Sequence, residues 1–174
     1  MSHGSLVWSR GHSFENYCFD FNVLNEHFEV CSSLITSALV ESALNLFKEI
    51  LQSVLHVACA ISLAARDSQY LSVTKGGSIK GCIHWTNLCL RDGKLNIDIL
   101  KFKEILLKTD SRAEKVENFV EKYKYWYQRL DLVDQEISRW LCHGHIGFST
   151  IWAAYTFCVY QAIDKSIPES KKRK

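Results

Sequence analysis

The sequence is poor in the residues that interrupt secondary structure. Its 174 residues include a single proline, Pro168, and only eight glycines. Because proline and glycine mark most turns and linkers, this scarcity excludes long flexible linkers. No internal repeat is found, and only the last residues are of low complexity. We therefore predict one domain over residues 1–167, followed by a basic disordered tail at 168–174.

Neither sign of charge dominates the chain. The 21 basic side chains nearly balance the 19 acidic ones, and the formal net charge is +2. This balance excludes a strongly cationic protein that binds nucleic acid by charge alone, although nucleic acid stays open as a partner. Hydrophobic residues make up 47% of the chain, which is enough for an ordinary globular core.

Secretory features are also missing. The opening residues, MSHGSLVWSRGHS, contain no apolar core of a signal peptide. The seven cysteines are odd in number, and no Cys-x-x-Cys pair occurs among them. Cys59 and Cys158 lie inside apolar runs, where a reduced thiol serves as a small hydrophobic side chain. These features predict a protein of the reducing cytoplasm.

Long uncharged runs are few. The clearest covers residues 146–163, which is near the lower length limit for a membrane-spanning helix. This run contains serine, threonine, glutamine and tyrosine, so its hydrophobicity is moderate. We therefore predict a buried core helix and no membrane association.

What the sequence does contain is helical periodicity. Apolar residues recur at spacings of three and four over residues 33–65, which predicts one long helix or two joined helices. A second apolar stripe runs over residues 116–140, and Ser111 with Glu114 forms a capping box before it. A last helix is predicted over residues 148–164.

Strand signals are fewer. Residues 5–9 are typical of a short strand, and residues 70–85 predict a β-hairpin that turns at Gly76-Gly77. Residues 95–109 begin as an extended segment and continue as a short helix. The predicted fold class is therefore α+β, mainly α-helical. It combines a short N-terminal strand, one central hairpin and several helices, of which the last is buried.

Cysteine and histidine cluster at two places in the sequence. The two groups are Cys82, His84 and Cys89, and Cys142, His143 and His145. Zinc accepts these ligand types, but the spacings match no standard finger or ribbon. We interpret the residues as buried thiols and hydrogen-bonded imidazoles, with a structural zinc site as the alternative.

Arg139 and His145 form a second pattern with chemical meaning. An arginine can bind a phosphodiester, while a histidine nearby moves the proton of an attacking 2′-hydroxyl group. The five intervening residues resemble the Arg-x(4–6)-His motif of the HEPN ribonucleases, which are compact helical domains. Gly144 inside the motif favours a helix end rather than a continuous helix.

Ser13 and Glu15 follow the predicted first strand and its turn. A carboxylate at the end of a strand can bind Mg²⁺, but a magnesium site for phosphoryl chemistry gathers several acidic groups. Local chemistry alone favours the other interpretation, in which Glu15 lies at a helix start near backbone N–H groups.

Two segments carry a family resemblance. GHSFENYCFDFNVLN, residues 11–25, resembles the His-Ser-x-Glu-Asn-Tyr-Leu segment of the Toprim-like domain-of-unknown-function family 4435. WLCHGHIGFSTIW, residues 140–152, resembles that family's late Gly-His/Lys-Asp-x-Leu segment. Members occur beside OLD-type and ABC-type ATPases, and one is the nuclease partner in an anti-phage defence system. The resemblance covers most of this chain but only the later half of the family.

The resemblance implies a metal-dependent nuclease that lacks most of its metal site. In complete members a glutamate after a strand and an Asp-x-Asp motif bind divalent metal, and this chain contains neither. The family's Ser-x-Glu motif matches Ser13 and Glu15, so the resemblance implies that Glu15 is a metal ligand and that Ser13 supports it by a hydrogen bond. Ile146 replaces the aspartate that commonly follows Gly-His. We therefore expect Mg²⁺ or Mn²⁺ to bind only when a separate acidic half supplies the missing glutamate and Asp-x-Asp motif. The chain alone is then catalytically incomplete.

The predicted function is the C-terminal portion of a Toprim-like, ATPase-associated nuclease of anti-phage defence type. An OLD-type or ABC-type ATPase is the expected partner. One alternative is a HEPN-like helical ribonuclease that uses Arg139 and His145. The other is a non-enzymatic interaction domain, which predicts a contiguous exposed apolar patch.

Overall fold

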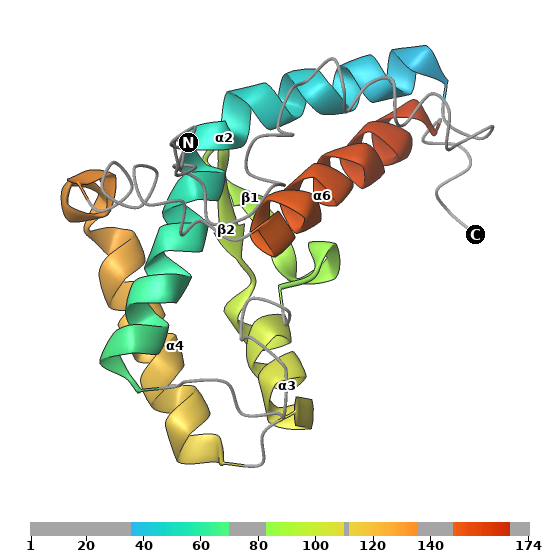
Figure 1. Cartoon of the computed structure of the whole chain (residues 1–174). Coiled ribbons are helices and arrows are strands. Elements are labelled where there is room, and N and C mark those ends of the chain that lie inside the picture. Colours follow the sequence, from blue (N-terminus) through green and yellow to red (C-terminus); the bar gives the residue numbers. More distant parts are fainter. Residues whose placement is uncertain (1–35, 70–82, 110–111, 136–147, 168–174) are drawn as a thin grey trace, which may run out of the picture.

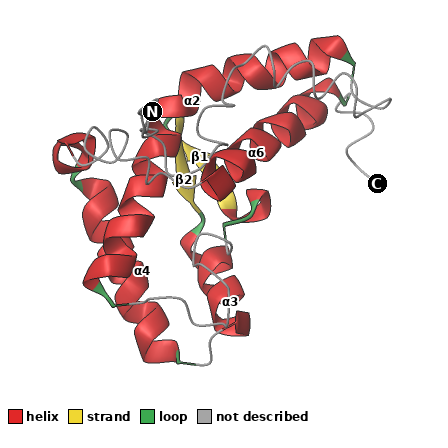
Figure 2. Cartoon of the chain, in the orientation of Figure 1, coloured by secondary structure: helices red, strands yellow, loops and turns green. Residues whose placement is uncertain are grey.

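The computed structural model describes residues 36–69, 83–109, 112–135 and 148–167. Within these residues the chain is mostly helical and contains one two-stranded antiparallel hairpin (Figure 2). This confirms the predicted class, α+β and mainly α-helical. The predicted strand at 5–9, the glycine turn and the basic tail lie outside the described residues.

Helix α2, Ser37–Asp67, is the longest element and contacts α4, α6 and the hairpin. Thr36 begins it, because its Oγ1 accepts a hydrogen bond from the backbone N of Leu39 at 3.4 Å. The predicted long helix is confirmed, with its start a few residues later than expected. In Figure 1, α2 changes direction along its length. Ser53 Oγ donates to the carbonyl of Ile50 at 2.7 Å, a bond of the kind that bends helices.

Helix α2 is also long and apolar enough to cross a membrane, judged by length and composition. Its most apolar 18-residue window has a mean hydropathy of 1.4, and 67% of that window is buried inside the protein. A core helix packed by its neighbours has the same composition. Burial against the rest of the protein therefore accounts for the apolar character of α2.

The hairpin consists of β1, Leu88–Arg91, and β2, Lys94–Ile97, in antiparallel register. Asp92 and Gly93 connect the strands with φ of 51° and 73°. Two successive positive φ values are typical of the type I′ turn, whose twist matches that of paired strands. Asp-Gly is a strong signal for this turn, and the sequence prediction passed over it in favour of Gly76-Gly77.

The predicted hairpin strand over residues 78–85 is wrong where the structure describes it. Residues 83–84 form no strand, and Trp85–Asn87 form a 3-10 turn, η3. The backbone N of His84 donates to Asn87 Oδ1 at 3.1 Å, and the backbone N of Asn87 donates to the carbonyl of His84 at 3.0 Å. These reciprocal bonds satisfy the backbone locally, so the chain turns before β1 begins.

Helix α3, Ile99–Thr109, follows the extended residues of β2, as predicted. Helix α4, Ala113–Gln128, comes next, with Arg112 as N-cap and no side-chain capping bond. The predicted capping box is therefore not the helix start, and Ser111 itself lies outside the described residues. The two helices lie side by side, joined by an ion pair between Lys103 and Glu117.

The continuous helix predicted through residue 140 is wrong. Helix α4 ends at Gln128, Arg129 leaves the helical conformation with φ −96° and ψ 63°, and residues 130–135 are helical again. Val133 is fully buried, as are Val116 and Phe119 before the break. Both segments face the core, so the apolar pattern continues through the break and hides it.

Helix α6, Phe148–Ser166, runs alongside the first part of α2 (Figure 1), which confirms the predicted last helix. Tyr155 meets the Phe47 ring edge-on, with ring centroids 5.7 Å apart. Cys158 is buried in the same helix, and burial raises the pKa of its thiol to about 12. The interpretation of Cys158 as a small hydrophobic residue is therefore confirmed.

Candidate nucleic-acid interface on helix α4

The site residues predicted from sequence lie outside the described residues. This holds for Ser13 and Glu15 and for the pair Arg139 and His145. In the described part of the chain, no group of three or more histidine, cysteine, aspartate or glutamate side chains could hold a metal ion. The chemistry that the structure does place is on the outer surface of α4.

Helix α4 is fixed in rotation by its buried face. Val116, Phe119, Val120 and Tyr123 are buried. Tyr123 donates from its hydroxyl to Asn96 Oδ1 at 2.9 Å, and burial raises its pKa well above the usual value. Tyr127 donates to the backbone carbonyl of Leu95 at 2.5 Å. These bonds to β2 determine which residues α4 presents to solvent.

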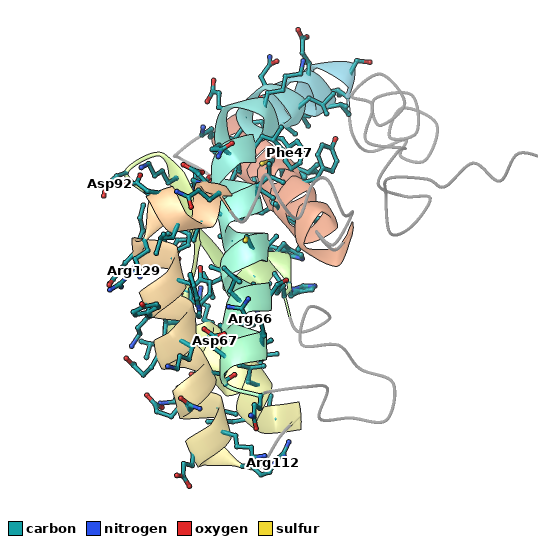
Figure 3. The ribbon with its side chains drawn as sticks, turned by 60° about the vertical axis from the view of Figure 1, so that its left-hand side comes forward. Phe47, Arg66, Asp67, Asp92, Arg112 and Arg129 are labelled. Atoms are coloured by element: carbon teal, nitrogen blue, oxygen red, sulfur yellow. The ribbon has the colours of Figure 1, made fainter. Side chains whose placement is uncertain are left out.

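The outward-facing residues of α4 separate by charge. Spacings of three and four place residues on one face of a helix. One such series, here called the basic stripe, contains no acidic residue: Arg112, Lys115, Asn118, Lys122, Tyr125 and Arg129. Beside it runs an acidic stripe: Glu114, Glu117 and Glu121. Figure 3 shows Arg112 and Arg129 near opposite ends of α4.

The acidic stripe is largely compensated within the protein. Glu117 pairs with Lys103 of α3, and Glu121 accepts a bond from Lys124 Nζ at 2.6 Å. By contrast, Lys115, Lys122 and Arg129 form no ion pair with a described residue. Glu114 is exposed and has no ion pair among the described residues, so one acidic and three basic side chains of these two stripes are without an ion pair.

Aromatic side chains join the basic stripe at its C-terminal end. The Arg129 guanidinium lies 3.7 Å from the centroid of the Tyr125 ring, and Arg129 is exposed. Tyr125 is 44% exposed and meets Trp126 edge-on, with ring centroids 5.5 Å apart and an interplanar angle of 88°. An arginine stacked on an aromatic face is a cation–π contact whose outer surface stays open to a ligand.

Trp126 in turn links α4 to the end of α2. Its Nε1 donates to Asp67 Oδ2 at 2.8 Å, and Arg66 Nε donates to Asp67 Oδ1 at 2.8 Å. Partial burial raises the Asp67 pKa, but the hydrogen bonds from Arg66 and Trp126 outweigh it, so the pKa is lowered overall. Asp67 is thus ionised at neutral pH, and Figure 3 shows Arg66 and Asp67 on α2 beside α4.

A second connection ties α2 to the segment that follows α4. His56, which is buried, contacts Asp134 Oδ1 through Nε2, and Gln52 Nε2 donates to the same carboxylate oxygen at 2.9 Å. The hydrogen bond from His56 is the largest cause of the lowered pKa of Asp134. No local sequence pattern indicates this group, because Asp134 lies 78 residues after His56 and 82 residues after Gln52.

The described members of the predicted cysteine and histidine group have structural roles. His84 Nδ1 lies 2.9 Å from Thr86 Oγ1 and accepts from the backbone N of Thr86. Cys89 Sγ donates to the carbonyl of Asn96 at 3.7 Å across the hairpin. These contacts favour the interpretation of a hydrogen-bonded imidazole and a packed thiol.

The basic stripe has the chemistry of a surface that contacts nucleic acid. From Arg112 to Arg129 it spans about 25 Å at roughly 1.5 Å per residue. Lysine and arginine contact phosphates, and exposed aromatic or guanidinium planes stack on bases. The spacing of the basic residues, taken separately from that of the acidic residues, would have revealed the stripe in the sequence. Only the structure shows which acidic residues form ion pairs.

Comparison of the chain with protein-family models, with curated proteins and with solved structures found no match. The Toprim-like resemblance therefore stays a prediction, which depends on the two segments quoted above. The fold class depends on the described helices and hairpin alone.

Proposed function

We propose that this chain binds nucleic acid through the basic stripe of α4, as the helical portion of a Toprim-like, ATPase-associated nuclease of anti-phage defence type. The observation that carries the proposal is a run of basic, amide and aromatic side chains without an acidic residue. The Ser13-x-Glu15-Asn-Tyr segment and the mainly helical fold support the family part of the proposal.

The described residues contain no group that fits a divalent metal site. Glu15 is one carboxylate, with Ser13 as its support, and phosphoryl transfer with Mg²⁺ or Mn²⁺ requires several ligands. The described residues add no group that could complete the site. We therefore derive no cleavage step for the chain alone. The proposal therefore includes two partners that act in the cytoplasm. One is an acidic half, which supplies the missing metal-binding carboxylates. The other is an OLD-type or ABC-type ATPase, which licenses cleavage.

The direct test measures binding of the full chain to fluorescent oligonucleotides at several salt concentrations. Lys122→Gln should weaken binding to all sequences and reduce the slope of log K against log salt by about one. Lys124→Gln is the matched control, because Lys124 lies outside the basic stripe and is already paired with Glu121. Equal effects of the two substitutions, or binding without salt dependence, would contradict the proposal.

A cleavage assay separates the proposed nuclease from the helical ribonuclease. Cleavage that needs Mn²⁺ and an added acidic half, and that is lost in Glu15→Gln, supports the Toprim-like proposal. The mainly helical fold also favours the HEPN-like alternative. That alternative predicts RNA cleavage in EDTA by the chain alone, lost in His145→Ala but not in Glu15→Gln.

The interaction-domain alternative depends on exposed apolar surface. Leu100 and Leu107 of α3 are 74% and 38% exposed, and their spacing of seven places them on one face. Two leucines form a smaller surface than the several hundred Å² typical of a docking patch. The basic stripe is therefore the better-supported contact surface among the described residues.

A further inference from the structure

We infer that the basic stripe selects single-stranded nucleic acid, because an unpaired base stacks on the Arg129 guanidinium where it covers Tyr125. This inference rests on the proposed function and specifies the class of ligand for the same surface. Its basis is the geometry of three side chains at the end of α4: Tyr125, Trp126 and Arg129.

The stacked pair is held in place before any ligand binds. The distance of 3.7 Å from the Arg129 Cζ to the Tyr125 centroid is typical of a guanidinium lying plane-on-plane over a ring. The Tyr125 ring abuts Trp126, and Trp126 is hydrogen-bonded to Asp67 of α2. Because each member is oriented by the next, little side-chain freedom is lost when a base is added.

The Arg129 guanidinium lies over the Tyr125 ring, and Arg129 is exposed to solvent. A guanidinium plane is a recognised stacking surface for unpaired bases. In a duplex the base faces are covered by neighbouring pairs, so only a single strand or a frayed end can offer a free face.

Lys122 is placed to contact the phosphate next to the stacked base. It lies one helical turn before Tyr125 on the basic stripe, and it is exposed. A phosphate next to the stacked base can therefore be neutralised by Lys122 while the base covers Arg129. Phosphate contact alone does not distinguish single strands from duplexes, so the preference comes from the stacked pair.

The test compares Arg129→Lys with the unsubstituted full chain, using a single strand of about 20 thymidines and a duplex closed by hairpin loops at both ends. Lysine keeps the charge but removes the stacking plane. We expect single-strand affinity to fall about tenfold, with duplex affinity changed less than about twofold. A Tyr125→Leu variant, which removes the support under the guanidinium, should reproduce this selectivity.

The outcomes separate this inference from the proposed function. If Lys122→Gln weakens binding to both ligands while Arg129→Lys affects both equally or neither, the stacking inference is wrong and the proposed function stands. If Lys122→Gln has no larger effect than Lys124→Gln, the proposed function itself is wrong. Arg129 is exposed outside the helix, so an unchanged circular-dichroism spectrum should accompany Arg129→Lys.

Discussion

The two halves of helix α2 are buried in different ways. In the first half, burial follows one stripe: Val40, Ala43, Leu44, Phe47 and Ile50. In the second half, every residue from His56 to Ala64 is buried. The first half is thus an amphipathic surface helix, whereas the second half is a central helix surrounded by other parts of the chain.

The partners of the two halves differ accordingly. The first half packs against α6, and residues of both helices line a groove of about 400 Å³, among them Glu41, Asn45, Glu49 and Lys165. The second half is tied by polar side chains to β2, to residues 130–135 and to α4. Ser53 accepts from the backbone N of Leu95, His56 contacts Asp134, and Asp67 accepts from Trp126 Nε1.

This difference bears on function. The hydrophobic effect favours burial of a surface but does not fix the orientation of the side chains that form it. A hydrogen bond requires a defined distance and angle, so it also fixes the relative position of its two partners. Helix α4, which carries the basic stripe, is bound to the half of α2 that makes directional bonds. The orientation of Tyr125 and Arg129 therefore depends on the second half of α2 more than on the first.

A matched pair of lysine substitutions gives the largest expected contrast. Ala60 is fully buried in the second half, and Ala38 is exposed in the first half. Ala60→Lys places an unpaired charge in the core and should destabilise the fold by more than about 4 kcal/mol, whereas Ala38→Lys should change stability by less than about 0.5 kcal/mol. Urea unfolding followed by circular dichroism measures both. Similar stabilities for the two variants would refute the contrast between the halves.

Two buried serines of the second half give the next contrast. Ser53 Oγ accepts from the backbone N of Leu95 at 2.8 Å, whereas the Ser62 Oγ bond to the Ala58 carbonyl stays within α2. Ser53→Ala leaves a buried N–H without its acceptor and should cost about 1–3 kcal/mol. Ser62→Ala should cost less than about 0.5 kcal/mol, since alanine favours the helix.

The measurement is again the free energy of unfolding in urea, with the denaturant slope compared to confirm two-state behaviour. Equal losses for Ser53→Ala and Ser62→Ala would mean that the link from α2 to β2 contributes nothing beyond burial. In that case α4 would be oriented on β2 by the bonds of Tyr123 and Tyr127 without support from Ser53.

The sequence predicted the helices well and their boundaries less well. Apolar periodicity predicted α2 and α4, and a long uncharged run predicted α6. The break at Arg129 was missed because Val133 continues the apolar pattern after it. The hairpin at Asp92-Gly93 was missed because the prediction used the glycine pair Gly76-Gly77, which lies outside the described residues, as its turn signal.

The candidate site was predicted less well than the fold. Ser13, Glu15, Arg139 and His145 were chosen for their chemistry in short motifs, and the described residues test none of them. The basic stripe was present in the spacing of α4. Its significance depends on long-range facts, such as the pairing of Glu117 with Lys103, that no local pattern contains.

The smallest expected effect concerns the carboxylate of Asp134, whose side chain is half exposed. The hydrogen bond from His56 lowers its pKa in the folded protein. A lowered folded pKa stabilises the protein above the unfolded value, about 3.9, and this contribution is lost as the pH falls through the folded pKa. The stability advantage of the unsubstituted chain over Asp134→Asn should therefore shrink as the pH falls below about 5.

Asp131→Asn, on the same helical segment, controls for the removal of one negative charge near α4. Because solvent screens an exposed carboxylate, we expect the Asp134 effect to be well below that of Ser53→Ala. Urea unfolding at several acidic pH values measures the difference. A difference that stays constant over this range would show that His56 and Asp134 contact each other without electrostatic coupling. The second half of α2 would then depend on Ser53 and Asp67 for its directional bonds.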